Sequence, residues 1–181
     1  IANNPNHLAG AIDSDNADKG ARFLQLCDAF DIPVVSLIDT PGMMVGPEVE
    51  KTALVRHCSR MFVVGANVTV PMVSIVLRKC YGLGAQTMAA GSLKAPLMTV
   101  SWPTGEFGGM GLEGAVRLGY RKELEAETNP AKREELEAFL IARAYENGSA
   151  LNMASHVEID DVIDPADTRR WIVSRTISSR V

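Results

Sequence analysis

The order of apolar segments predicts an α/β fold built on a parallel sheet. Residues 32–38 (IPVVSLI) and 70–77 (VPMVSIVL) are continuous runs rich in β-branched residues, which is typical of strands buried on both faces. Segments with apolar residues at spacings of three and four follow them, as expected of helices that pack on a sheet. Strands that alternate with helices require parallel crossovers, and ligands of such folds bind at the carboxyl ends of the strands.

The elements are predicted in one order along a single domain that spans residues 1–181. Strands are predicted at residues 8–13, 32–38, 70–77 and 97–102. Helices are predicted at residues 17–30, 48–65, about 82–90 and 131–145, and at the end of the chain within 160–180. Helix starts are indicated by the capping residues Ser14 to Asn16 and by the prolines Pro47, Pro130 and Pro165.

Composition and charge exclude several classes of partner. The 181 residues are 46% hydrophobic and 22% charged, with a net charge of −4 and an isoelectric point near 5.4. Lysines and arginines are scattered, so neither nucleic acid nor an anionic membrane is an expected partner. The sequence contains no apolar run of membrane-spanning length and no signal peptide, so we expect a cytoplasmic protein, or a mitochondrial matrix protein if the source is eukaryotic.

The three cysteines are predicted to be reduced packing residues. Cys27, Cys58 and Cys80 form no CxxC pair and fall in segments of regular structure. The chain opens on Ile1 rather than on methionine, which indicates a fragment of a longer protein.

A glycine-rich turn is the strongest candidate for chemistry. Tyr81-Gly82-Leu83-Gly84-Ala85-Gln86 follows a buried strand and opens a helix. The first N–H groups of a helix have no partner within it, so they can hold negative charge on an oxygen without a charged side chain. The alternative is that the glycines only permit a tight turn. The spacing fits neither GxGxxG nor GxxxxGK[ST], which disfavours a phosphate site.

Two further segments lie at strand ends. Asp39-Thr40-Pro41-Gly42 resembles the DxxG turn of GTPases, but no GxxxxGK[ST] loop precedes it, so a simple strand-ending turn is favoured. Glu106, in the segment TGEFGGMG, is a candidate general base. A lone carboxylate is more often an anchoring acceptor.

Metal and nucleophile sites are not indicated. The histidines His7, His57 and His156 are isolated, and no spacing typical of metal ligands occurs, so no metal is predicted. No GxSxG motif is present either.

Three stretches occur in a specific order: DNADKGARFLQLCDAFDIPVVSLIDTPG, then VTVPMVSIVLRKCYGLGA, then WPTGEFGGMGLEGAV. With the shorter matches RK.YG, WP..E and DD.I.P..TR, this order resembles the C-terminal half of the carboxyltransferase (beta) subunit of biotin-dependent acyl-CoA carboxylases. The resemblance covers nearly the whole chain. It implies a crotonase-like (ClpP/crotonase) fold of repeated β-β-α units.

The resemblance also implies a reaction. In that family the carboxyl group passes from carboxybiotin, carried by a biotin carboxyl carrier protein, to the α-carbon of an acyl-CoA. The biotin ureido oxyanion takes the α-proton, so two oxyanion holes replace a catalytic side chain. Implied partners are the carrier and biotin carboxylase subunit, the coenzyme A thioester, and further copies in a homo-oligomer with sites between subunits. The implied N-terminal acyl-CoA-side half is missing from these residues, so the chain alone is expected to be inactive.

By the same resemblance, the amides of Leu83 and Gly84 hold the ureido oxygen of biotin and are the catalytic residues. The implied wall of the biotin and substrate site consists of Asp39, Pro41, Gly42, Tyr81, Gly82 and Gln86. Two departures affect the substrate. The family's GGAYD is GLGAQ here, with Leu83 in place of a glycine and Gln86 in place of an aspartate that resembles an acyl-chain contact.

Two alternatives keep the same fold. One is a biotin-dependent acyl-CoA decarboxylase, which shares these motifs. The other is a non-catalytic assembly domain in which the changes at Leu83 and Gln86 have removed the chemistry.

Overall fold

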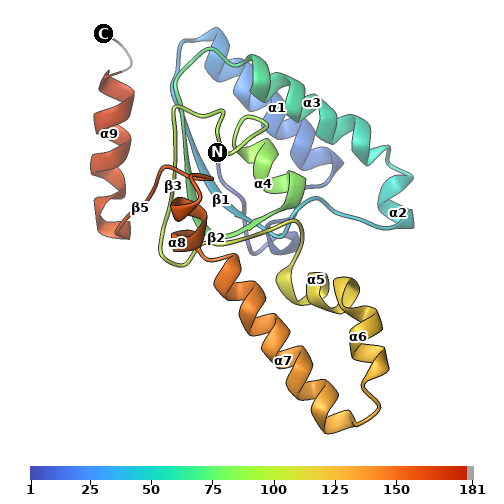
Figure 1. Ribbon diagram of the computed structural model, residues 1–181. Helices are drawn as coiled ribbons and strands as arrows, with labels where there is room; N and C mark the ends of the chain where they lie inside the picture. The colour runs from blue at the N-terminus through green and yellow to red at the C-terminus, as the bar shows by residue number, and fades with distance from the viewer. Residues whose placement is uncertain (179–181) are drawn as a thin grey trace.

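A parallel β-sheet forms the centre of the domain in the computed structural model, which describes residues 1–178 (Figure 1). Among these residues the sheet has five strands, in the order β1-β2-β3-β5 with β4 also paired to β2, and every pairing is parallel. The strands are β1 (Val34–Thr40), β2 (Met72–Tyr81), β3 (Met98–Ser101), β4 (Glu106–Gly108) and β5 (Asp161–Val162). The α/β class with a parallel sheet is confirmed.

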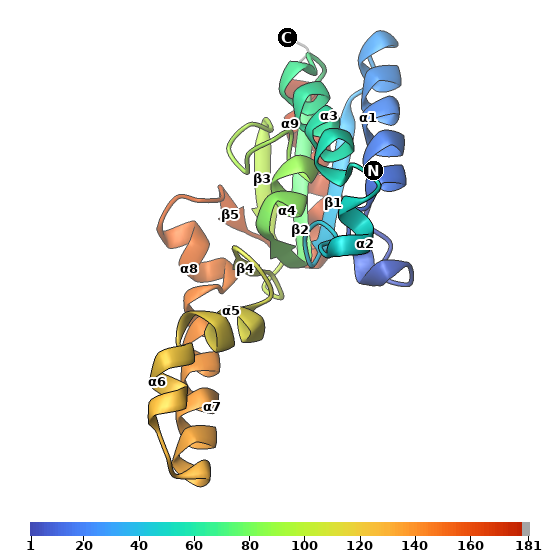
Figure 2. The ribbon, with the colours of Figure 1, turned by 90° about the vertical axis from the view of Figure 1, so that its right-hand side faces the viewer.

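Helices cover both faces of the sheet (Figures 1 and 2). One face carries α1 (Ser14–Ala29), α3 (Leu54–Asn67) and α4 (Gly82–Met88). Their apolar residues pack in one cluster with Ile38 and Val76 of the sheet. The other face carries α9 (Thr168–Ser178), whose Trp171 and Ile172 pack against a second cluster around Val73 and Ile75. The core is therefore a three-layer sandwich around β1 and β2.

A helical arm projects from one end of the sandwich (Figure 2). It consists of α5 (Leu112–Gly119), α6 (Arg121–Ala126) and α7 (Pro130–Asn147), after which α8 (Ala150–Ser155) returns the chain to the sheet. None of residues 130–147, all of which the structure describes, is buried. The helix α7 therefore contributes little to the core, and the buried residues of the arm are Leu112 and Val116 in α5 and Leu124 in α6.

The strand predicted at residues 8–13 is wrong. Leu8, Ala9 and Gly10 all have positive φ (49°, 52° and 86°), so they form a short 3₁₀ turn, η1 (Leu8–Gly10). Of residues 8–13, only Ile12 makes an isolated β-bridge, and its partner is Met43. Of this run only Gly10, Ala11 and Ile12 are buried, whereas Leu8 is 42% exposed.

The helix predicted at residues 48–65 is two helices, α2 (Pro47–Glu50) and α3, because Ala53 adopts a left-handed conformation between them. The strands predicted at 32–38 and 70–77 both extend further, to Thr40 and Tyr81. Asp39 and Arg78 therefore lie within strands rather than in turns. The short elements β4, β5 and α8, and η2 (Pro165–Asp167), were not predicted individually.

The helices predicted at residues 17–30 and 131–145 are present as α1 and α7. The cap of α1 is Asp13, whose carboxylate accepts from the N–H of Asn16 at 2.8 Å. The terminal helix is α9, and the end of its predicted range lies outside the described residues.

The burial predicted for the three cysteines is confirmed, and all three are free thiols. Within residues 1–178, no helix combines the length and the apolar character needed to cross a bilayer.

Candidate functional site

The glycine turn joins the end of β2 to the start of α4. Tyr81 is the last residue of the strand, and Gly82 begins the helix with a φ of +57°, a conformation that glycine adopts at little cost. Leu83 and Gly84 are the second and third residues of α4. Amides at these two positions have no acceptor within the helix, so the predicted main-chain donors are present at a strand-to-helix turn.

Gly84 packs backbone to backbone against the loop that follows β1. A Cβ atom at Gly84 would lie 2.6 Å from the carbonyl carbon and 2.7 Å from the Cα of Gly42. Both glycines are buried. Because neither backbone can easily retreat, any side chain at position 84 would displace the turn.

Gly82 lies equally close to a third loop. A Cβ atom there would be 2.8 Å from the carbonyl oxygen of Gly109, in the glycine-rich segment after β4. The loops after β1, β2 and β4 therefore meet at one end of the sheet, which is where a parallel fold is expected to bind a ligand.

The loop after β1 is held by its own hydrogen bonds. The Thr40 hydroxyl accepts from the N–H of Gly42 at 3.1 Å and lies 3.2 Å from the Gly42 carbonyl oxygen. That carbonyl also accepts from the N–H of Ile12 at 3.0 Å. Pro41 lies between these two anchored residues, so the loop presents a fixed surface beside Gly84.

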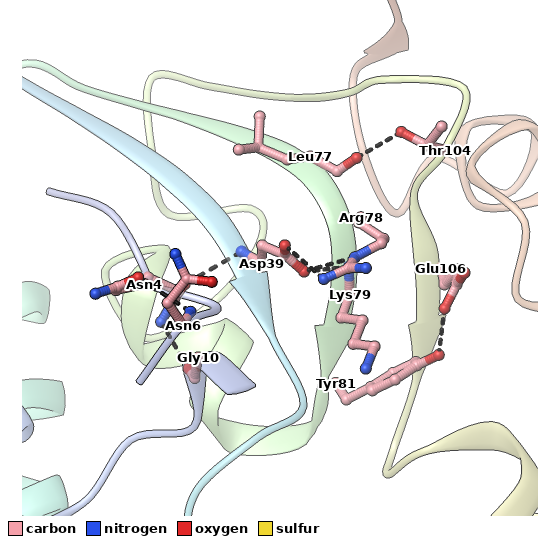
Figure 3. Close-up of polar contacts among 11 residues, drawn as sticks. Asn4, Asn6, Gly10, Asp39, Leu77, Arg78, Lys79, Tyr81, Thr104 and Glu106 are labelled. Carbon is pink, nitrogen blue, oxygen red and sulfur yellow. Dashed lines mark hydrogen bonds and ion pairs between the residues drawn. The ribbon is translucent and has the colours of Figure 1, made fainter. Parts of the chain in front are cut away.

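The Asp39 carboxylate accepts hydrogen bonds from two neighbouring residues of β2, Arg78 and Lys79 (Figure 3). Its Oδ1 accepts from Arg78 Nε at 3.3 Å and from the N–H of Lys79 at 3.1 Å, and its Oδ2 accepts from Arg78 Nη2 at 3.1 Å. Asp39 is buried, whereas the Arg78 side chain is half-exposed. The hydrogen bond from Arg78 to Asp39, with the attraction between the two charges, raises the pKa of the guanidinium.

Tyr81 and Glu106 form a second pair, on the opposite side of β2 (Figure 3). The Tyr81 hydroxyl donates to Glu106 Oε2 at 2.7 Å. Burial and, secondarily, this carboxylate raise the pKa of the Tyr81 phenol, so it stays protonated and remains the donor. Glu106, which the sequence suggested as a possible base, accepts a hydrogen bond from a buried tyrosine in this structure.

The nearby thiol is not equipped as a nucleophile. Cys80 precedes Tyr81 and is buried, and burial raises the pKa of its thiol to about 12. A thiol with this pKa is protonated at neutral pH. The groups of the turn that can stabilise negative charge are therefore its main-chain N–H donors.

The turn is open to solvent on its outer side. The Leu83 side chain is 58% exposed, and Gln86, one helical turn further along α4, is exposed as well. A cavity of about 570 Å³ is lined by the first residues of the chain and by α1, and within the described residues neither Leu83 nor Gly84 lines it. The turn therefore lies apart from this cavity, with the Leu83 side chain on the surface of the described residues.

The structure brings most of the predicted site residues together. The loop carrying Pro41 and Gly42 contacts the turn Gly82 to Gly84 directly, and Asp39 and Tyr81 flank it at the strand ends. Gln86 lies on the helix behind the turn. Sequence reasoning missed the partners of Asp39 and Tyr81, although Arg78 and Glu106 were visible as members of the motifs RK.YG and WP..E.

Comparisons with known proteins agree on one family. The family model described as "Carboxyl transferase domain" matches residues 1–180. The propionyl-CoA carboxylase carboxyltransferase subunit of Haloferax mediterranei is 37% identical over 96% of this chain and 33% of its own length. The chain thus spans about a third of the length of this curated relative.

Two solved structures share the fold. A single-chain, multi-domain long-chain acyl-CoA carboxylase is 57% identical, with a TM-score of 0.85 over 97% of this chain and 17% of that protein. The transcarboxylase 12S structure, titled for its hexamer assembly and for bound methylmalonyl-coenzyme A, is 35% identical, with a TM-score of 0.84 over 96% of this chain and 32% of that protein. The crotonase-like fold implied by the resemblance is confirmed.

Proposed function

This chain belongs to the carboxyl transferase domain family, and on that premise we propose that it forms the biotin side of an acyl-CoA carboxylase active site. In this proposal the complete enzyme transfers a carboxyl group from carboxybiotin to the α-carbon of an acyl-CoA. The observation that carries the proposal is the glycine turn, in which the amides of Leu83 and Gly84 are at the start of a helix and lack acceptors within it.

The residues present fit a biotin ureido group. The amides of Leu83 and Gly84 are donors at a helix start, and the backbone contact of Gly84 with Gly42 holds them in place. When bound, carboxybiotin supplies the carboxyl group, and its ureido oxygen carries the negative charge left behind. Pro41, Gly42 and Gly82 would line the wall beside the ring.

The protein's contribution is electrostatic preorganisation rather than side-chain acid-base chemistry. Main-chain donors fixed in advance stabilise a developing oxyanion without reorganising during the reaction. The nearest titratable groups in the strand, the Cys80 thiol and the Tyr81 phenol, have raised pKa values and stay protonated. They therefore do not compete for the proton that moves in the reaction.

The substrate is proposed to be a coenzyme A thioester with an apolar acyl chain. Leu83 exposes an apolar side chain at the turn, and Gln86 is uncharged where the family pattern has an aspartate. The 57% identity to a long-chain acyl-CoA carboxylase supports a chain longer than propionyl. The proposal is tested by comparing the rates at which the complete enzyme carboxylates propionyl-CoA and palmitoyl-CoA.

The site requires a second surface. The turn is open on its outer side, where the Leu83 side chain is exposed. We therefore propose that an acyl-CoA-side half, provided by another subunit of a homo-oligomer, completes the site. The biotin carboxyl carrier and the biotin carboxylase are the remaining proposed partners.

An assay of the complete enzyme tests the function. The purified enzyme, supplied with ATP, labelled bicarbonate and an acyl-CoA, should form acid-stable labelled product, and avidin should block the reaction because it sequesters biotin. Decarboxylation of a malonyl-type CoA without net carboxylation would instead assign the decarboxylase function. No avidin-sensitive reaction in either direction would favour a non-catalytic assembly domain.

A further inference from the structure

Four polar residues of the sequence motifs are not used by the proposed chemistry. They are Asp39, Arg78, Tyr81 and Glu106. The structure joins them into two pairs, Asp39 with Arg78 and Tyr81 with Glu106, on opposite sides of the last residues of β2 (Figure 3). One member of each pair, Arg78 or Tyr81, lies in the last residues of β2, just before the glycine turn.

The first pair closes an irregularity in the sheet. The register of β1 against β2 shifts between Ile38, which pairs with Val76, and Thr40, which pairs with Cys80. Such a shift leaves backbone groups of β2 without a partner in the ladder. The carboxylate of Asp39 accepts from one of them, the N–H of Lys79, while it also binds Arg78.

The opposite edge of β2 changes its neighbour at the same place. Residues Val73 to Val76 pair with β3, whereas Lys79 to Tyr81 pair with β4. The Thr104 hydroxyl donates to the Leu77 carbonyl between the two ladders. Tyr81 then donates to Glu106, the first residue of β4, which fixes the second ladder just before the turn.

The two glycines of the turn have no side chain with which to set their position, and the Leu83 side chain between them is exposed. Gly84 rests on the backbone of Gly42, and Gly82 rests on the carbonyl of Gly109. Gly42 follows β1 and Gly109 follows β4, so the two contacts hold the turn in place only if the ends of β1 and β4 are themselves fixed. The Asp39–Arg78 pair fixes the β1 side of β2, and the Tyr81–Glu106 pair fixes the β4 side.

We propose that Asp39, Arg78, Tyr81 and Glu106 are positioning residues that hold the amides of Leu83 and Gly84 in their working geometry. This inference rests on the proposed function, because the working geometry is that of an oxyanion hole. Small displacements of such donors reduce turnover more than they reduce substrate affinity. The two pairs therefore act on kcat through the turn and not by touching the substrate.

The test uses the complete enzyme and removes one hydroxyl. Tyr81→Phe should lower kcat about tenfold and leave the KM for acyl-CoA within about twofold. Glu106→Gln keeps an acceptor oxygen and should retain most of the activity, whereas Glu106→Ala should match Tyr81→Phe. Arg78→Lys, which keeps the charge but loses the two-pronged contact, should also lower kcat. Tyr120→Phe is the matched control, because Tyr120 lies in the helical arm and is exposed.

A second readout does not depend on activity. Hydrogen exchange of the backbone amides in residues 82–88 should be faster in Tyr81→Phe than in the wild-type and Tyr120→Phe enzymes. Unchanged kcat and unchanged exchange in Tyr81→Phe would overturn the inference while leaving the function intact. A wild-type enzyme without avidin-sensitive turnover would instead overturn the function, and the exchange experiment would still report whether the pairs hold the turn.

Discussion

The glycine turn and the helical arm are packed in opposite ways. Around the turn, buried side chains of β1, β2 and α4 form one cluster, and glycine lies against glycine with no room for a single added carbon. In the arm, no residue from 130 to 147, a range described in full, is buried, and Leu118 and Phe139 are 67% and 60% exposed. A site built on main-chain groups requires the first kind of packing, because it has no side chain to adjust.

Among the substitutions considered, we expect one at Gly84 to lower turnover the most. Replacing Gly84 with alanine places a carbon less than 3 Å from the backbone of Gly42, so the turn must move. Loss of an oxyanion donor lowers kcat by about 100- to 1,000-fold, and we expect Gly84→Ala to approach this range in the complete enzyme. Steady-state carboxylation assays measure it.

The control is a glycine in the arm. A Cβ atom at Gly119 would meet nothing within 4 Å, and the residue ends the helix α5. Gly119→Ala should therefore leave turnover unchanged. Equal activity of the two variants would contradict the close packing described for the turn.

The same contrast applies to stability. Ile38 in β1 is fully buried, so Ile38→Ala should lower the opening free energy of the sheet amides by about 2–5 kcal/mol. Phe139→Ala, in the arm, should change the opening free energy of its own helix by less than about 0.5 kcal/mol. Hydrogen exchange resolved by peptide measures both values in the complete enzyme. A large loss of protection around Phe139 would show that a partner packs on the arm.

The junction between the regions should behave like the core. A Cβ atom at Gly148, just after α7, would meet the backbone carbonyl oxygen of Phe107, and the Gly148 carbonyl accepts from the N–H of Phe107 at 2.8 Å. We expect Gly148→Ala to destabilise β4 by about 1–3 kcal/mol, because the backbone must shift. Thermal unfolding of this variant beside Gly119→Ala checks the value, and equal midpoints would refute it.

The smallest effect concerns alkaline pH. Burial raises the pKa of Cys80 from 9.0 to about 12, so between these values the unfolded thiol ionises while the folded thiol stays neutral. Stability from this group is complete below pH 9 and should fall by about 1 kcal/mol per pH unit above it. The difference in unfolding free energy between wild type and Cys80→Ala, measured at pH 8 and pH 10, isolates the effect. A difference that does not change with pH would contradict the burial of the thiol.

The long buried strands and amphipathic helices could be predicted because their patterns are local. The runs at 32–38 and 70–77 are apolar along their whole length, and both proved to be strands of the sheet, β1 and β2. The strand at residues 8–13 could not be distinguished from a buried turn. Its conformation depends on Gly10 fitting against the carbonyl oxygen of Asp39, a contact between distant parts of the chain.

The candidate site was predicted in part for a similar reason. The turn at Gly82 to Gly84 could be found from glycine spacing and from the family resemblance. The pairing of Asp39 with Arg78 could not, because it depends on a shift in strand register that leaves no signal in either strand. Glu106 appeared as a lone carboxylate because its partner is Tyr81, in a different segment.

A structure of the complete enzyme with biotin bound tests whether the amides of Leu83 and Gly84 hold the ureido oxygen. We expect the ureido oxygen to lie about 2.7–3.1 Å from the amide nitrogens of Leu83 and Gly84, beside the loop of Gly42. A ureido oxygen held by side chains elsewhere, with both amides bound to water or protein groups, would contradict it.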